Sequence, residues 1–407
     1  MSTFDAAITG AGLVTSAGIG VPQAWQRICE GAGTAASAVP ALAGTPADFG
    51  CQVADFDPIP TLGKRKAWRL DRSSQFAVAA AVEAVGDAGL TSSDWSAPRV
   101  GVVLGNGIGG AATWEKQHRT LLEEGPKQVS GMLIPMLSIN MSAGYVAMHL
   151  GVTGPNFVTA TACASGTTAI GMARELLRSN ACDVVIAGGT EACLVPSIVA
   201  GFSQMGALSK NADVERASRP FDAERDGFVA AEGAAVLVLE RVEDAVARNA
   251  RIYARVTGYG ASADAHHATA PDPEGAGAEL ALRSALRAAE IGPADVQHVN
   301  AHGTSTPLND MVESRMIQRV LGDRPAVTSI KGVVGHALGA AGAIEAVATA
   351  LSLHHSVIPP TANLTKQDPE IGVDIVAGAA RSTPIDVAVS NSFGFGGQNA
   401  VLVLGKA

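Results

Sequence analysis

GPNFVTATACASGTTAIGMARELLRS, residues 154–179, is the stretch on which the predicted fold and chemistry depend. Its apolar start predicts a short strand at Asn156–Val158, which leads through small residues to Cys163 and then to an amphipathic helix. A cysteine at the start of a helix lies at the positive end of the helix dipole, which lowers the thiol pKa and favours the thiolate. A single cysteine is more often a buried core thiol. This strand–turn–helix context nevertheless indicates that Cys163 is a nucleophile.

Strand-like and helical segments alternate along the rest of the chain, which predicts layered α/β structure. Helices are expected at Val21–Glu30 and Ser73–Ala88. RVGVVL, Arg99–Leu104, has contiguous apolar residues and is typical of a strand buried on both faces. Further strands are predicted at Ala6–Thr9, Asp183–Ala187, Ala234–Leu239, Ile252–Tyr259, His298–Ala301, Asp386–Ser390 and Ala400–Leu404.

Two parts of the chain resemble each other. AITGAG at residues 7–12 matches RVTGYG at residues 255–260, and in both we expect a strand that turns on the glycines. VVLGNG at residues 102–107 and VNAHGT at residues 299–304 follow at corresponding places. The pattern predicts a duplication, with an N-terminal half at 1–250 that carries the cysteine and a C-terminal half at 251–407. No low-complexity linker separates the halves, so we expect them to pack as one body.

Composition excludes several classes of function. The 407 residues carry a net charge of −9 and no long run of Lys and Arg, which argues against nucleic-acid binding. The N-terminus lacks the pattern of a signal peptide, and no apolar run reaches the ~18 residues of a membrane span. We therefore expect a cytoplasmic protein without a membrane segment. The 5 cysteines form no CxxC pair, so neither a disulfide framework nor a zinc site is expected.

Two histidines occur in small-residue motifs downstream of the cysteine. NAHGTSTPLND, residues 300–310, places His302 at the end of a predicted strand. KGVVGHALGAAGAIE, residues 331–345, places His336 before a predicted helix and five positions after Lys331. A cysteine with two histidines is typical of a nucleophile assisted by two imidazoles. A metal site is the competing interpretation, although these spacings match no usual zinc pattern.

Five motifs, in chain order, resemble those of the β-ketoacyl-acyl carrier protein synthases, most closely the elongating KAS II group. They are TACASG (161–166), RPFDAERDGFVAAEGA (219–234), the two histidine motifs, and NSFGFGGQN (391–399). The resemblance spans essentially the whole chain. It implies a thiolase fold, in which two duplicated halves form a five-layer α-β-α-β-α sandwich, and a dimer. The implied activity is decarboxylative condensation of an enzyme-bound acyl chain with malonyl-carrier protein.

The resemblance also assigns roles to individual residues. It implies a catalytic triad of Cys163, His302 and His336, with Lys331 ordering the site and Glu313 as the buried carboxylate partner of that lysine. The other implied residues are Phe395 and Phe393 at the oxyanion hole and gate, Thr304 and Thr306 on the pantetheine arm, and Ile108, Phe202, Leu133 and Leu137 around the acyl pocket. We expect Leu133 and Leu137 to come from the partner subunit.

The implied partners are an acyl carrier protein and a second subunit. Substrates would travel on the carrier's phosphopantetheine, with no other cofactor and no catalytic metal. KRKAWRLDR, residues 64–72, matches the dock for the acidic carrier protein, while Gly206 stands where a basic residue is common. Some relatives hold a structural cation without a catalytic role, at positions that match Asn300, Glu313, Glu345, Ser390 and Asn391.

Several alternatives stay open. GNGIGG at residues 105–110 fits a dinucleotide-binding fingerprint but lacks the acidic residue at the expected distance. A coenzyme A-dependent thiolase would need a second cysteine near the C-terminus, and none follows Cys193. A silent partner subunit would lack the nucleophile. KGVVGH and VAAEGA depart from the usual forms and favour a polyketide or polyene pathway over fatty-acid elongation. The dimer is either a homodimer or a heterodimer with a chain-length-factor-like subunit.

Overall fold

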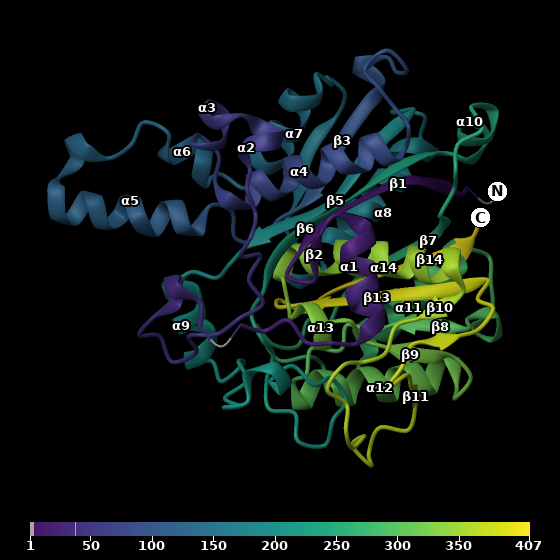
Figure 1. Ribbon diagram of the computed structural model, residues 1–407. Helices are drawn as coiled ribbons and strands as arrows, with labels where there is room; N and C mark the ends of the chain where they lie inside the picture. The colour runs from purple at the N-terminus through teal and green to yellow at the C-terminus, as the bar shows by residue number, and fades with distance from the viewer. Residues whose placement is uncertain (1–3, 37) are drawn as a thin grey trace.

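The two glycine-containing openings of the chain form adjacent central strands of one mixed sheet in the computed structural model, which describes residues 4–36 and 38–407 (Figure 1). The order is β4-β3-β5-β6-β1 in the first half and β7-β14-β13-β8-β9-β11 in the second. Antiparallel pairing of β1 with β7 joins the halves, with Ala6 opposite Val256. The strands of this path are β1 Ala6–Thr15, β3 Val100–Gly105, β4 Asn156–Thr159, β5 Val184–Ala192, β6 Glu232–Arg241, β7 Ala254–Ala263, β8 His298–Asn300, β9 Ala326–Thr328, β11 Asp374–Ile375, β13 Val387–Gly394 and β14 Gln398–Lys406.

The same strand order occurs in both halves. β3 lies between β4 and β5, and β8 lies between β9 and β13 in the same way. β3 runs into VVLGNG and β8 runs into VNAHGT, so these two motifs lie at the ends of strands that occupy equivalent places. Short strands complete the set: β2 Gly18–Ile19, β10 Val357–Ile358 and β12 Arg381–Ser382.

The chain does not turn at the glycines of AITGAG and RVTGYG, contrary to the expectation from the sequence, because β1 and β7 continue through them. β1 continues through Gly10 and Gly12, and a Cβ atom there would lie 2.1 Å and 2.0 Å from backbone oxygens of helix α4 (Arg72–Asp87). In the second half, Gly258 and Gly260 would meet backbone oxygens of α11 (Ala276–Ala288) at 2.3 Å and 2.1 Å. Glycine is required in both halves because a helix lies directly against the strand.

Five layers result from the way helices cover this sheet. α4 and α7 (Met141–Leu150) cover the outer face of the first half, and α11 and α12 (Pro307–Leu321) form the opposite outer layer. Between the half-sheets lie α8 (Ser165–Arg178) and α14 (Ala341–His355). Residues 341–353 of α14 are all buried, and their many alanines and glycine allow this central helix to fit between two sheets. The α-β-α-β-α arrangement is the expected one.

The remaining helices lie around this sandwich, and α5 extends away from it as an arm, with α6 near the start of α5 (Figure 1). Their bounds are α1 Val21–Glu30, α2 Ile59–Leu62, α3 Lys64–Ala67, α5 Ala111–Glu124, α6 Leu133–Leu137, α9 Pro196–Gln204, α10 Val242–Ala247 and α13 Lys331–Val334. Across residues 4–36 and 38–407, none of the helices has the length and apolar character needed to cross a membrane.

Candidate active site

Cys163 lies in a single 3-10 turn, Ala162–Ala164, between β4 and α8. The preceding Ala162 has φ 48°, a left-handed conformation that costs energy for a residue with a side chain. Ser165 holds this turn, because its hydroxyl accepts from the Thr161 N–H at 2.9 Å and donates to the Ala162 carbonyl at 2.6 Å. The strained turn therefore fixes the thiol at the start of α8, where the sequence placed it.

His302 follows β8 in a loop that Glu313 holds from α12. The Glu313 carboxylate accepts the backbone N–H groups of His302 and Gly303, both at 2.8 Å, and the side chain of Asn391 at 3.0 Å. Burial raises the pKa of Glu313 to about 7, against the lowering effect of these three donors. Glu313 thus supports the histidine loop through its backbone.

The buried partner of Lys331 is Glu345, and the expected pairing with Glu313 is wrong. The Lys331 ammonium forms an ion pair with Glu345 on α14, and it also donates to the His302 carbonyl at 2.5 Å. Its Nζ lies 3.4 Å from Nδ1 of His302. Glu345 closes the same motif that begins with Lys331, so sequence could have offered it as a candidate. Only the packing of α14 against the histidine loop selects it over Glu313.

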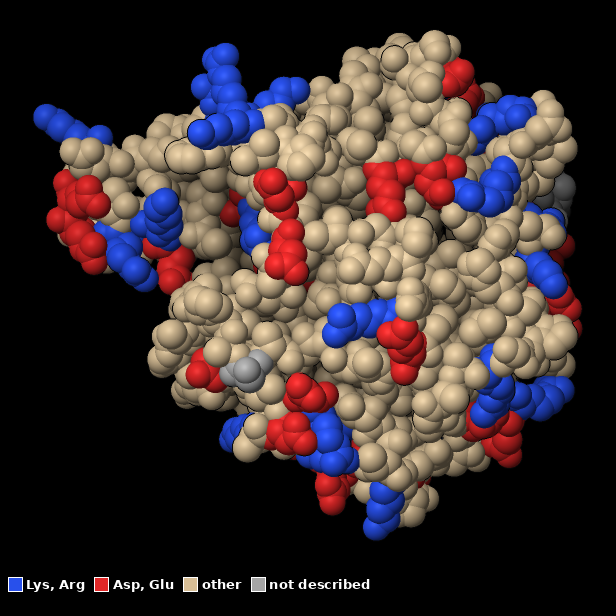
Figure 2. Space-filling view, in the orientation of Figure 1, with Lys and Arg blue, Asp and Glu red and all other residues tan. Residues whose placement is uncertain are grey.

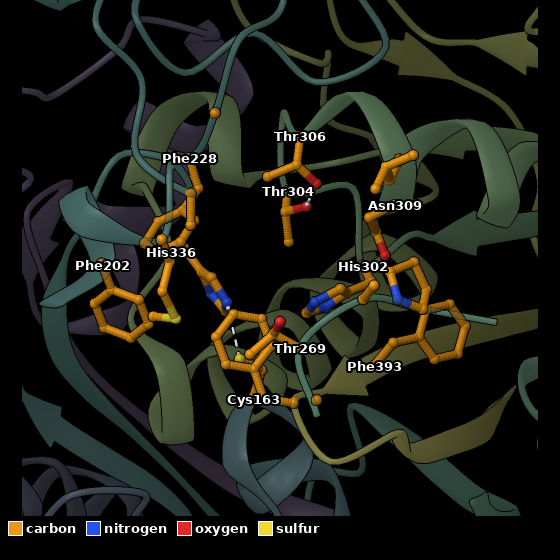
Figure 3. Close-up of a pocket in the computed structure, with 18 of the residues that line it drawn as sticks. Cys163, Phe202, Phe228, Thr269, His302, Thr304, Thr306, Asn309, His336 and Phe393 are labelled. Carbon is orange, nitrogen blue, oxygen red and sulfur yellow. Dashed lines mark hydrogen bonds between the residues drawn. The ribbon is translucent and has the colours of Figure 1, made fainter. Parts of the chain in front are cut away.

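His336 and His302 approach the thiol from opposite sides of the pocket (Figure 3). Nε2 of His336 lies 3.1 Å from the Cys163 sulfur, and the two imidazole rings are 5.4 Å apart between centroids. Burial lowers the pKa of both imidazoles well below the usual value, and the positive charge of Lys331 adds to this effect. Both rings are therefore neutral at physiological pH.

The thiol pKa moves in the direction opposite to the expectation from helix position. Burial raises the pKa of Cys163 to about 12, while Lys331 and the backbone N–H of Phe395 lower it by less. The thiol is largely buried, and the resulting penalty on the thiolate exceeds the effect of the helix terminus. The resting form is therefore a thiol in contact with a neutral imidazole. Phe395 also lines the cavity onto which the thiol opens.

The three residues open onto a cavity of about 420 Å³. Phe202, Phe393 and Phe395 line it near the thiol, and Thr304 and Thr306 line it further out, with their hydroxyl oxygens 2.8 Å apart. The GFGG turn carries Phe395 and has positive φ at Gly396 and Gly397, so glycine is required there. Of the described residues that line this cavity, none is Lys or Arg.

An apolar cluster fills the space beside the thiol. It contains Cys163, Cys193 and Leu338, with Ile108, Ile198 and Phe202 packed against them. Ile108 and Phe202 are thus close to the thiol. Leu133 and Leu137 lie on α6, half-buried, and do not line the cavity of their own chain. Sequence reasoning missed Cys193 and Ile198, because no local motif connects them with residue 163.

Four buried side-chain oxygens on β8, β13 and α14 lack hydrogen-bond partners among the described residues. They are Asn300 Oδ1, Glu345 Oε2, Ser390 Oγ and Asn391 Oδ1. A hard cation prefers oxygen ligands of this kind, so this set fits the structural cation that the resemblance implies. There a cation would neutralise buried charge and tie α14 to β13, without contact to the reacting atoms.

Comparisons with known proteins agree with this geometry. Models of the β-ketoacyl synthase N-terminal and C-terminal domains match residues 4–245 and 253–365. The chain is 44% identical over 404 residues to 3-oxoacyl-[acyl-carrier-protein] synthase 2 of Synechocystis sp., covering 98% of this chain and 97% of the relative. The chain is also similar to solved structures, and in the two that follow the match covers 100% of this chain and 100% of the other. One is the ishigamide ketosynthase/chain length factor (TM-score 0.94, 33% identity). The other is a type II PKS acyl-carrier protein in complex with its hexaketide-bound ketosynthase (TM-score 0.92, 32% identity). These neighbours confirm the thiolase fold.

Proposed function

The chain belongs to the β-ketoacyl synthase family of acyltransferase-class condensing enzymes, and on this basis we propose that it acts as a 3-oxoacyl-[acyl-carrier-protein] synthase in polyketide or fatty-acid biosynthesis. One observation supports this most directly: a buried thiol 3.1 Å from one neutral imidazole, with a second imidazole opposite. We further propose that residues 1–250 and 251–407 are the two halves, the first with Cys163 and the second with both histidines.

In the first half-reaction, an acyl group moves from the carrier's pantetheine thiol to Cys163. Nε2 of His336 accepts the thiol proton as the sulfur attacks the thioester carbonyl, and the proton then goes to the departing pantetheine sulfur. The backbone N–H groups of Cys163 and Phe395 stabilise the tetrahedral oxyanion. The products are the acyl-Cys163 thioester and a free pantetheine thiol.

In the second half-reaction, malonyl-carrier protein loses CO2 and leaves an enolate on its thioester oxygen. Neutral His302 and His336 donate N–H bonds to that oxygen, and each donor of this kind contributes about 3 kcal/mol. The first half-reaction leaves Nε2 of His336 unprotonated, so this ring has to change to its Nε2–H tautomer before it can donate. Lys331 contacts Nδ1 of His302, which keeps the other nitrogen, Nε2, protonated and facing the pocket. The enolate carbon attacks the acyl-Cys163 carbonyl, a carbon–carbon bond forms, and the bond from that carbonyl to the Cys163 sulfur breaks. The β-ketoacyl product leaves on the carrier, and the released Cys163 thiolate takes up a proton from solvent to restore the resting thiol.

The charge at the mouth favours carrier-bound substrates over free coenzyme A thioesters. Asp226 and Asp264 line the cavity, with no Lys or Arg among its described lining residues to pair with the phosphates of coenzyme A. Thr304 and Thr306 instead offer hydroxyl groups to a neutral pantetheine arm. This argues against the alternative of a coenzyme A-dependent condensing enzyme. No cofactor other than the carrier's phosphopantetheine is needed.

The dock for that carrier is proposed on α3. Lys64, Arg65 and Lys66 form this short helix, Trp68 beside it is 77% exposed, and basic side chains gather on the surface over α3 (Figure 2). These cations form no ion pair with other described residues, so they are free to meet an acidic partner. The enzyme is proposed to be cytoplasmic and to work as a dimer, with a second copy or with a chain-length-factor-like subunit.

Mass spectrometry of carrier-bound products tests the proposal. The purified protein is mixed with acyl-carrier and malonyl-carrier protein, and a β-ketoacyl product two carbons longer is expected. Acetyl-coenzyme A and malonyl-coenzyme A serve as the matched control for the rival activity. A product from the coenzyme A thioesters alone, with none on the carrier, would overturn the proposal.

A further inference from the structure

One buried carboxylate, that of Glu191, has no part in the mechanism described above. Glu191 lies near the end of β5 and is fully buried. Its oxygens accept backbone N–H groups of Gly107 at 2.8 Å, Ile108 at 3.3 Å and Gly339 at 3.1 Å. Within residues 4–36 and 38–407, it forms no ion pair with Lys, Arg or His. Burying a carboxylate that has backbone amides as its hydrogen-bond donors, with no counter-charge, costs free energy of folding. The question is therefore what its three contacts contribute in return.

The three amides belong to two loops with different tasks. Gly107 and Ile108 follow β3, and Ile108 packs against the apolar cluster at Cys163. Gly339 lies three residues after His336, next to Leu338, which has φ 44° and belongs to the same cluster. A Cβ on Gly339 would lie 2.6 Å from the Gly107 nitrogen and 2.7 Å from the carboxylate. The two loops therefore touch at Glu191, and both glycines are needed for that approach.

We propose that Glu191 is a positioning residue that couples the filling of the acyl pocket to the placement of His336. This inference rests on the proposed function. Ile108 packs beside the thiol and is not among the described residues that line the open cavity, so a long acyl chain on Cys163 must displace it. Displacement pulls the Ile108 amide away from the carboxylate that also holds Gly339. The loop of His336 then shifts, and the enzyme responds to the acyl chain before malonyl arrives.

Asn106 provides a matched comparison on the same turn. Its side-chain oxygen accepts the N–H groups of Ile108 at 3.2 Å and Gly109 at 2.7 Å, and among the described residues this side chain forms no hydrogen bond with the His336 loop. Asn106→Ala therefore loosens the turn and leaves the bridge intact. Glu240→Gln is a second control, since Glu240 is equally buried at the far end of β6 and bonds Thr9 and Arg248.

The test measures single-turnover CO2 release from malonyl-carrier protein after Cys163 has been acylated with a four-carbon or a twelve-carbon chain. In the parent enzyme the two rates should differ by about fivefold or more. In Glu191→Gln the ratio should fall to about one, while both control variants keep it. An unchanged ratio in Glu191→Gln, or equal rates in the parent, would overturn the coupling alone. If the parent enzyme neither becomes acylated at Cys163 nor releases CO2, the proposed function is wrong as well.

Hydrogen exchange on the unmodified sequence gives a second readout that does not depend on folding of a variant. Cys163 is alkylated with iodoacetamide or with its N-dodecyl derivative. The dodecyl group should increase exchange both in the peptide around residues 106–110 and in that around residues 337–341, whereas iodoacetamide should change neither. Increased exchange around residues 106–110 alone would contradict the bridge.

Discussion

Nε2 of His336 lies 3.1 Å from the sulfur of Cys163, and burial keeps both groups uncharged. The thiol pKa of about 12 means that the sulfur carries its proton at neutral pH. Attack on a thioester therefore begins with proton transfer to the imidazole and not with a standing thiolate. This relationship determines how the nucleophile should respond to pH.

Alkylation of Cys163 by iodoacetamide should accelerate by roughly tenfold per pH unit between pH 7 and pH 9, because the thiolate is the reactive form and its fraction rises up to the pKa of about 12. Mass spectrometry should find Cys163 labelled before the other buried thiols, Cys51, Cys182 and Cys193, since it lines the open cavity and they do not. Cys163→Ala should keep the fold and lose acyl transfer. A rate that levels off below pH 8, or first labelling at Cys51, would contradict this assignment.

Replacing either His302 or His336 by alanine should slow 14CO2 release from malonyl-carrier protein by about 100-fold or more, because each removes one donor to the enolate oxygen. In both variants self-acylation of Cys163 should slow less than decarboxylation does. It should slow more in the His336 variant than in the His302 variant, because only the former loses the contact with sulfur. His298→Gln is the matched control: that ring is also buried on β8, but among the described residues it bonds only the Ala326 carbonyl. Parental decarboxylation in both alanine variants would refute the mechanism.

The Lys331–Glu345 pair predicts a specific pattern of stability. Lys331→Met should destabilise the protein by about 3–5 kcal/mol in urea unfolding, since it leaves a buried carboxylate without its counter-charge. Adding Glu345→Gln should restore part of that loss. Glu313→Gln removes a carboxylate that meets Lys331 only through the shared His302 backbone, so its coupling to Lys331→Met should be smaller than that of Glu345→Gln. Equal coupling of Lys331 to both glutamates would show that the pairing is not specific.

The acyl pocket predicts a change in product length. Ile108→Phe should shorten the longest acyl chain accepted, because the larger ring fills the apolar cluster beside Cys163. Chromatography of the carrier-bound products measures this directly. Ile59→Phe, an equivalent change on exposed α2, should leave the distribution unchanged. If Ile108→Phe also leaves it unchanged, the pocket lies elsewhere.

Local sequence patterns predicted most of the strands and the two principal motifs, but not what depends on long-range packing. In the sequence, a glycine at which a strand ends in a turn cannot be told from one that lets a helix pack closely against the strand. The continuation of β1 past Gly10 depends on the packing of α4, which no local pattern indicates. The lowered thiol pKa expected at Cys163 took account of the helix start but not of desolvation by segments far away in sequence. Likewise, nothing local distinguishes Glu313 from Glu345 as the partner of Lys331.

Assembly is the last prediction, and it follows from two unpartnered features of the chain. β4 ends the path of paired strands, and its residues 156–159 immediately precede the turn of Cys163. An open strand edge is seldom left exposed to water. The arm formed by α5 and α6 also exposes large apolar side chains, with Leu122 72% and Ile134 64% exposed. We expect β4 to pair with the same strand of a neighbouring subunit and the arm to pack against that neighbour.

Light scattering on the chain expressed alone should therefore give a dimer that is active in condensation if the protein serves fatty-acid elongation. If it serves a specialised pathway, activity and solubility should instead require co-expression with a chain-length-factor-like subunit. Ile134→Asp should weaken either assembly, because it places a charge in the apolar contact. Leu280→Asp is the matched control, since Leu280 is 53% exposed on α11, in the opposite outer layer. A stable, fully active monomer would contradict both forms of the dimer and the partner origin of Leu133 and Leu137.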